Sequence, residues 1–218
     1  MSINLEFARR RMVEQQVRCW EVYEPSVLAV LETIARDRFV PAPLMHLAYA
    51  DTAIPLPCGQ HMMKPIVDGR ILDILRPEPQ HSVLEIGTGS GFLAACLSKM
   101  ADSVVSIELH DELVAMARKN LARAEAVNVS VQQMDATSEL PDGKFDAVAI
   151  TASMPRFDAR FLEVLKPGGR LFAIVGEAPV MEARIITRGS GGEIESEAVF
   201  ETVVAPLENL PIPARFVF

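Results

Sequence analysis

The stretch VLEIGTGSGF, residues 83–92, decides the fold of this 218-residue chain. An apolar run typical of a buried strand leads into a turn with Gly87, Gly89 and Gly91, and a helix-like segment follows. Glycine adopts positive φ readily and lets a ligand approach the backbone N–H groups at the start of a helix. The spacing is G-x-G-x-G and differs from the G-x-G-x-x-G of dinucleotide-binding turns. We therefore expect a strand, a ligand-binding turn and a helix here.

Apolar strand-like runs alternate with helical segments from residue 82 onward. We expect strands at 82–87, 103–108, 129–135, 145–151 and 170–176, and helices at 92–100, 111–124 and 160–169. Two further runs, 183–188 and 198–204, flank a Gly-Ser turn and predict an antiparallel hairpin at the sheet edge. Near-continuous apolar strands between helices indicate a parallel sheet covered on both faces. The expected fold is α/β and Rossmann-like: a doubly wound, mainly parallel sheet of about seven strands.

The first 80 residues predict a helical extension of this sheet. Helical patterns cover residues 5–18, 25–36 and 66–75, and a proline-rich stretch at 40–65 predicts a long ordered loop. Loops of this length within compact proteins are usually functional. We expect two parts, with the helices and the functional loop at 1–80 and the ligand-binding core, hairpin and tail at 81–218.

Two carboxylates close the strands that follow the glycine turn. Glu108 ends the second expected strand, 21 positions after Gly87, where a carboxylate can accept both hydroxyls of an adenosine ribose. Asp135 ends the third strand, where a carboxylate can receive the exocyclic amine of adenine. Two other interpretations stand beside this one: packing glycines with ordinary surface acids, and a nicotinamide nucleotide site. The glycine spacing disfavours the nicotinamide site.

Composition excludes several classes of protein. Twenty-one Lys and Arg against 29 Asp and Glu give a net charge of −8, which disfavours nucleic acid as a partner. The three cysteines, Cys19, Cys58 and Cys96, are scattered and indicate free thiols in a reducing compartment. The charged N-terminus does not resemble a signal peptide, and no uncharged apolar run reaches the ~18–20 residues that span a bilayer. These features predict a cytoplasmic protein without membrane partners.

The motifs resemble those of a known family. The pattern E-x-G-x-G-x-G from Glu85, an acidic residue ending the second strand and an Asp-Ala pair ending the third are similar to class I S-adenosylmethionine-dependent methyltransferases. Residues 48–65, AYADTAIPLPCGQHMMKP, resemble the A-Y-x-D-x-x-L-P-I-x-x-G-Q-T-I-S-x-P block of protein-L-isoaspartate O-methyltransferases. The likeness covers about residues 6–177, and the tail after residue 178 differs from the usual ending of that family.

The resemblance implies S-adenosylmethionine as the cofactor and a peptide or protein carboxylate as the methyl acceptor, with a small molecule as the alternative. It implies a cofactor-binding set of Gln60, His61, Met62, Met63, Glu85, Gly87, Thr88, Gly89, Gly91, Glu108, Leu109, Asp135, Ala136 and Thr151.

The chain departs from the family at the catalytic triplet. The family has Thr-Ile-Ser where this chain has His61-Met62-Met63, so Met63 stands at the position of the catalytic serine and has no hydroxyl to donate. His61 is either a catalytic imidazole or a surface residue. Lys64 can attract an anionic acceptor or remain a solvated loop lysine, and Asp51 can anchor the loop or touch a ligand. Thr151 and Ser153 are expected at the rim after the fourth strand.

An ionised carboxylate acceptor, with a pKa of about 4, needs no general base. Three hypotheses follow for the function. The chain methylates isoaspartyl carboxylates, it methylates a different acceptor, or it binds the cofactor without catalysis.

Overall fold

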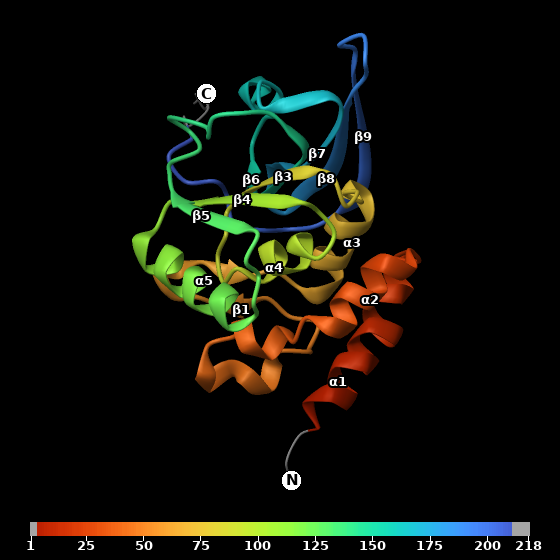
Figure 1. Cartoon of the computed structure of the whole chain (residues 1–218), viewed down its shortest axis with the longest axis vertical. Helices are drawn as coiled ribbons and strands as arrows, with labels where there is room; N and C mark the ends of the chain where they lie inside the picture. The colour runs from red at the N-terminus through yellow and green to blue at the C-terminus, as the bar shows by residue number, and fades with distance from the viewer. Residues whose placement is uncertain (1–3, 211–218) are drawn as a thin grey trace, which may run out of the picture.

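A seven-stranded sheet forms the centre of the molecule. The structure is a computed structural model that describes residues 4–210. The sheet has the order β5-β4-β3-β6-β7-β8-β9 (Figure 1). The first five strands in this order are mutually parallel, and β8 and β9 are antiparallel additions. The strands are β3 (Ser82–Ile86), β4 (Ser103–Glu108), β5 (Val129–Gln133), β6 (Phe145–Met154), β7 (Leu165–Glu177), β8 (Val180–Arg188) and β9 (Ile194–Glu201). The predicted mainly parallel, seven-stranded Rossmann-like sheet and its edge hairpin are confirmed.

The direction of winding reverses at β3. From β3 the chain builds outward to β4 and β5, and it then returns to place β6 on the other side of β3. Loops leaving the carboxyl ends of β3 and β6 therefore diverge, which opens a crevice at this edge of the sheet. The glycine turn at 87–91 lies at this point.

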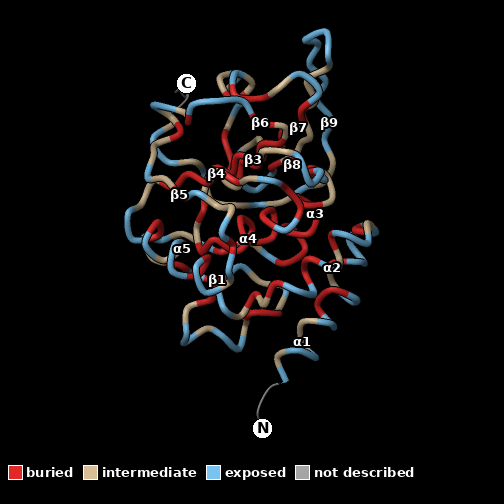
Figure 2. The backbone as a smooth tube through the Cα atoms, in the orientation of Figure 1, coloured by how far each residue is buried: buried red, intermediate tan, exposed pale blue. Residues whose placement is uncertain are grey.

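Within residues 4–210, five α-helices lie on one side of the sheet. They are α1 (Leu5–Met12), α2 (Pro25–Thr33), α3 (Pro65–Leu75), α4 (Phe92–Ser98) and α5 (Asp111–Arg123). Of these, α3, α4 and α5 contact the strands of the sheet. Figure 1 shows α3, α4 and α5 side by side beneath the strands, with α1 and α2 extending the helical layer away from them. All five contribute to one apolar cluster with the strand residues of this face, among them Val83, Val104 and Phe172. Every residue of α4 is buried, and Figure 2 shows the buried chain concentrated in the central strands, α3 and α4.

The opposite face has a separate apolar cluster formed by alternate strand residues such as Leu84, Ile86 and Val148. In the described part of the chain this face is covered by the connections between strands and by one 3₁₀ turn, η6 (Ala159–Leu162). The helix predicted at 160–169 is therefore wrong. Leu165 pairs with Phe145 and already belongs to β7, and Pro167 cannot donate the hydrogen bond that a helix interior requires. Sheet pairing and the burial of Phe161 prevail over the local helical pattern.

The N-terminal predictions are largely confirmed, with altered helix ends. The helix expected at 5–18 is helical throughout, but it changes from α1 to a π-helix, η1 (Val13–Val17), and a 3₁₀ turn, η2 (Arg18–Trp20). The helix expected at 25–36 ends at Thr33, because Ile34 adopts an extended conformation. A short 3₁₀ helix, η3 (Arg36–Phe39), follows it. The division into parts at residue 80 stays a prediction.

The proline-rich stretch is an ordered loop, as expected. It contains the 3₁₀ helices η4 (Ala42–Leu47) and η5 (Pro57–Gly59). A two-stranded antiparallel pair, β1 (Ile54–Pro55) with β2 (His61–Met62), flanks η5. This pair sets the path of the segment that leads into α3. Every helix within residues 4–210 is too short or too polar to span a lipid bilayer.

The covering of the second face can be tested with Phe161→Ala. Phe161 is fully buried, so truncation leaves a cavity, and we expect the free energy of unfolding to fall by about 3–5 kcal/mol. Phe7→Ala is the matched control, because the Phe7 side chain is exposed, and it should change stability by no more than roughly 0.5 kcal/mol. Urea unfolding measures both variants, and equal losses would contradict the assigned core.

Candidate active site

A cavity of about 480 Å³ lies at the carboxyl ends of β3, β4 and β6. This volume is in the range of small-molecule sites. Of the predicted cofactor-binding residues, every one except Gly91 lies in its wall. Those in the wall are Gln60, His61, Met62, Met63, Glu85, Gly87, Thr88, Gly89, Glu108, Leu109, Asp135, Ala136 and Thr151. The tertiary structure thus brings separate segments of the chain around one space.

The glycines of the turn have different roles. A Cβ on Gly87 would collide with the Thr151 hydroxyl, which donates to the carbonyl oxygens of Ile86 and Gly87 at 2.9 Å. Gly91 is the N-cap residue of α4 and lies outside the cavity wall, and a Cβ there would press on α5, 3.2 Å from Leu121. Gly91 therefore serves the packing of α4 against α5.

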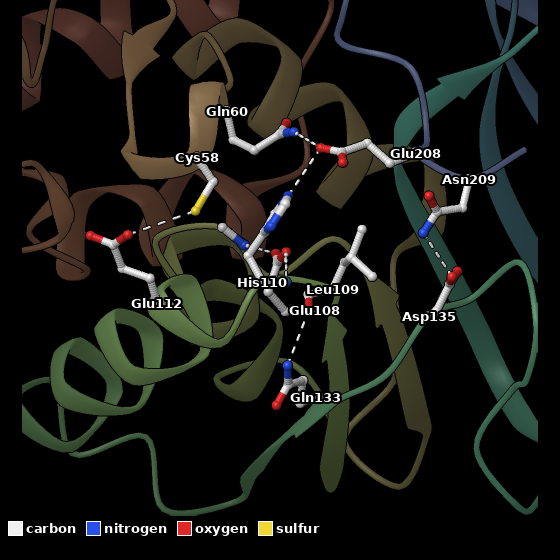
Figure 3. Close-up of polar contacts among 11 residues, drawn as sticks. Cys58, Gln60, Glu108, Leu109, His110, Glu112, Gln133, Asp135, Glu208 and Asn209 are labelled. Carbon is white, nitrogen blue, oxygen red and sulfur yellow. Dashed lines mark hydrogen bonds and ion pairs between the residues drawn. The ribbon is translucent and has the colours of Figure 1, made fainter.

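Glu108 ends β4 and ties the glycine turn to it. Its carboxylate accepts hydrogen bonds from the backbone N–H of Gly89 at 2.9 Å and of His110 at 3.2 Å. The side chain is buried yet lies in the cavity wall (Figure 3). Because an ionised carboxylate offers about four acceptor positions, Glu108 keeps capacity for ligand hydroxyls.

Asp135 follows β5 and faces the same cavity. One carboxylate oxygen accepts from the backbone N–H and the hydroxyl of Thr137, at 2.8 and 2.6 Å. The Thr137 hydroxyl bond is the main reason that the pKa of Asp135 lies below its ordinary value. The other oxygen accepts from the side-chain amide of Asn209 at 2.8 Å (Figure 3). The carboxylate is thus held in its ionised, hydrogen-bond-accepting form.

The segment after β9 completes the wall of the cavity. No local sequence pattern indicated that this segment would reach the site. Residues 202–208 line the cavity after crossing back toward β5 (Figure 1). Ser153 anchors this segment through its backbone, donating to Ala205 at 2.9 Å and accepting from Leu207 at 2.7 Å. Ser153, predicted at the rim after the fourth strand, is instead buried within β6, which runs on to Met154.

Glu208 joins two parts of the site across the cavity mouth. Its carboxylate accepts from the side-chain amide of Gln60 at 2.5 Å and lies 3.0 Å from the His110 ring nitrogen (Figure 3). Nothing in the local pattern singles out His110 or Glu208, because their partners are distant in the chain. His110 and the described part of the tail therefore join the site only in the tertiary structure.

Two buried acids line the inner part of the cavity. Glu85 is fully buried; one of its carboxylate oxygens accepts from the Ser106 hydroxyl, and the other has no hydrogen-bond partner among the described residues. Burial raises the pKa of Glu85 to about 8 and that of Asp68, which pairs with Arg36, to about 6. An unpaired buried carboxyl group beside a cavity suits a cationic ligand group, which would lower its pKa.

Comparison with known proteins identifies the family. The family model described as "Protein-L-isoaspartate(D-aspartate) O-methyltransferase (PCMT)" matches residues 8–210. The chain belongs to this family. A protein-L-isoaspartate O-methyltransferase of Koribacter versatilis is 34% identical over 200 residues, 91% of this chain and 90% of that protein. A protein of the same name from Methanoregula boonei is 35% identical over 200 residues, 91% of this chain and 92% of its own.

A solved structure has the same fold. It is described as a putative protein-L-isoaspartate O-methyltransferase from Plasmodium falciparum in complex with S-adenosyl-L-homocysteine. It matches with a TM-score of 0.81 at 19% identity, covering 93% of this chain and 99% of the other. The family match also corrects one expectation. The likeness continues through residue 210, so the segment after residue 178 belongs to the family pattern.

The segment at the position of the family's catalytic triplet lies along the cavity. His61 is exposed and Met62 is buried, both in β2, and Met63 is half-buried. The backbone carbonyl of Met63 accepts a hydrogen bond from the Arg36 guanidinium. Lys64 also lines the cavity, whereas Asp51 is exposed and lies outside its wall. The catalytic roles predicted for His61 and Met63 stay predictions.

The protonation of Glu85 can be tested by Glu85→Gln. Between its ordinary pKa of 4.5 and about 8, the folded chain holds a proton on Glu85 that the unfolded chain has released. The free energy of unfolding therefore falls as pH rises through this window, by on the order of 1.4 kcal/mol per pH unit for this one group. The amide removes this contribution, so the variant should lose less stability than the parent between about pH 5 and about pH 8.

Urea unfolding across this pH range measures the effect. Glu112→Gln, at an exposed position on α5, is the control and should keep the slope of the parent chain. A Glu85→Gln variant with an unchanged slope would show that Glu85 is ionised in the folded state.

Proposed function

We propose that this chain transfers a methyl group from S-adenosylmethionine to the side-chain carboxylate of an L-isoaspartyl residue in a peptide or protein. One observation carries the proposal. The glycine turn, Glu108, Asp135 and residues 60–63 surround a single cavity of about 480 Å³. The names of the relatives support the acceptor, and the S-adenosyl-L-homocysteine held by the similar solved structure supports the cofactor.

The residues present fit this cofactor. Glu108 has acceptor capacity for the two ribose hydroxyls, and Asp135 offers an ionised carboxylate to the amine of adenine. Glu85 offers a buried carboxyl oxygen without a partner among the described residues to the ammonium group of the methionine moiety. When bound, the cofactor supplies a methyl group on a positively charged sulfur. The acidic lining of the cavity favours such a cation.

The acceptor requires little acid–base chemistry from the chain. A carboxylate is ionised at neutral pH, so the chain needs to bind it, orient it and exclude water. Lys64 in the cavity wall can attract the anion, and the buried Met62 provides an apolar boundary. The serine hydroxyl of the family triplet has no counterpart in Met63. Alignment of the acceptor therefore depends on the backbone and shape of this segment.

A second candidate keeps the cofactor and changes the acceptor. The thioether of Met63 in the cavity wall favours an apolar small molecule or a different protein side chain over a carboxylate. The binding-only hypothesis predicts cofactor affinity without turnover. One assay separates the isoaspartyl hypothesis from these two.

The assay measures methyl esters formed from labelled S-adenosylmethionine on an L-isoaspartyl peptide and on the matching L-aspartyl peptide. We expect esterification of the isoaspartyl peptide alone, and loss of at least about tenfold in activity for Glu108→Ala, which removes the ribose acceptor. S-adenosylhomocysteine binding by calorimetry serves as the control for the integrity of the site. Binding without ester formation would reject the isoaspartyl acceptor, and an absence of binding would reject the cofactor.

Met63→Ser tests the role of the missing hydroxyl. A hydroxyl that donates to an anionic acceptor contributes about 1.5–3 kcal/mol, so kcat/KM for the isoaspartyl peptide should rise by roughly tenfold or more. Met63→Ala is the matched control, because it removes the thioether without supplying a donor. Equal kinetics for the two variants would show that the hydroxyl contributes nothing in this cavity.

A further inference from the structure

Arg36 is a fully buried charge behind the cavity wall. It begins η3, and none of its side chain is exposed. Buried guanidinium groups persist in folded proteins only where other groups compensate them. One Nη donates to the Asp68 carboxylate, and the other donates to the backbone carbonyl of Met63. The guanidinium carbon Cζ lies over the Phe92 ring, 4.8 Å from its centre.

These three partners belong to the walls of the site. Met63 ends the segment at the position of the catalytic triplet, and Asp68 lies in the first turn of α3; both line the cavity. Phe92 is the first residue of α4, directly after the glycine turn, and also lines the cavity. Arg36 itself is outside the wall. From behind the cavity wall, Arg36 therefore connects three parts of the site: the segment that ends at Met63, helix α3 and the glycine turn.

The chemistry of the bridge depends on the shape of the guanidinium. Its planar fork directs two N–H groups at two different acceptors at once, whereas an ammonium group acts as a compact point charge. The Asp68 carboxylate supplies the negative charge that makes burial of Arg36 tolerable. The bond to the Met63 carbonyl is not needed to neutralise the charge. Its effect is to fix the backbone of that residue.

We infer that Arg36 and Asp68 are positioning residues. They hold the backbone of residues 60–63 in a fixed position relative to the glycine turn, and so align the methyl acceptor. The inference rests on the proposed function and deepens it. With methionine at the position of the family serine, no side-chain hydroxyl of residue 63 can orient the acceptor. The backbone latch formed by Arg36, Asp68 and the Met63 carbonyl takes over this task. Misplacement of reacting groups by about 1 Å can cost on the order of a hundredfold in rate.

Arg36→Lys tests the latch while keeping the buried positive charge beside Asp68. The amides of residues 60–64 should exchange hydrogen at least about tenfold faster, because the lysine cannot hold Asp68 and Met63 together. The amides of β3 and β4 should keep their protection. With the isoaspartyl peptide, kcat should fall by roughly tenfold or more, whereas KM should stay within about threefold.

Arg70→Lys is the matched control. Arg70 is also buried, but it donates to the backbone carbonyls of Trp20 and Glu21, away from the cavity wall. It should lower stability without changing exchange at residues 60–64 or kcat. If both Arg→Lys variants lose stability but keep the exchange rates of residues 60–64 and kcat of the parent chain, the Arg36–Asp68 pair is merely structural. The inference is then overturned.

Asp68→Asn and Asp68→Ala provide a second, independent test. The amide keeps an acceptor for Arg36, so its exchange rates and kcat should lie between those of the parent and of Asp68→Ala. Equal effects of the two substitutions would contradict the latch. Hydrogen exchange at residues 60–64 decides the inference even where the parent chain does not methylate the isoaspartyl peptide. Failure of the proposed acceptor is therefore distinguishable from failure of the latch.

Discussion

The hydrogen bond from the Gly89 backbone N–H to the Glu108 carboxylate ties the glycine turn to the end of the neighbouring strand. An adenosyl-binding site needs a backbone that a ligand can approach closely and a carboxylate beside that backbone. This hydrogen bond holds the two next to each other. The reversal of strand order at β3 places this contact at the open edge of the sheet. The other walls of the cavity, from the loop before α3 to the segment after β9, are built around it.

Charge divides the cavity into two regions. Asp135 is held ionised by its hydrogen bonds near the mouth, whereas burial favours the protonated form of Glu85 at the inner end. A cofactor with a neutral adenosine part and a cationic amino-acid part matches this division. Asp68 lines the inner region and Arg36 lies behind it, and their charges neutralise each other, so the pair shapes the wall without adding net charge to it.

Much of the core fold followed from local patterns. The strands at 82–86 and 103–108 and the helix from Asp111 were predictable, because burial on both faces of a parallel sheet selects continuous apolar runs. The helix expected at 160–169 failed for a physical reason. Leu165 pairs with Phe145 in the sheet. The free-energy cost of leaving β6 without this strand partner exceeds the weak helical preference of residues 160–169.

The sequence by itself determined the family, the sheet and the residues at the ends of its strands. Carboxyl ends of neighbouring parallel strands meet at one edge, so Gly87, Glu108 and Asp135 had to converge once the strands were recognised. Only the tertiary structure decided that Arg36 supports Met63 and that Glu208 spans from Gln60 to His110. The contacts of Arg36 with Met63 and of Gln60 with Glu208 join residues 27 and 148 positions apart. They depend on where the chain returns across the sheet, and no short-range periodicity encodes that path.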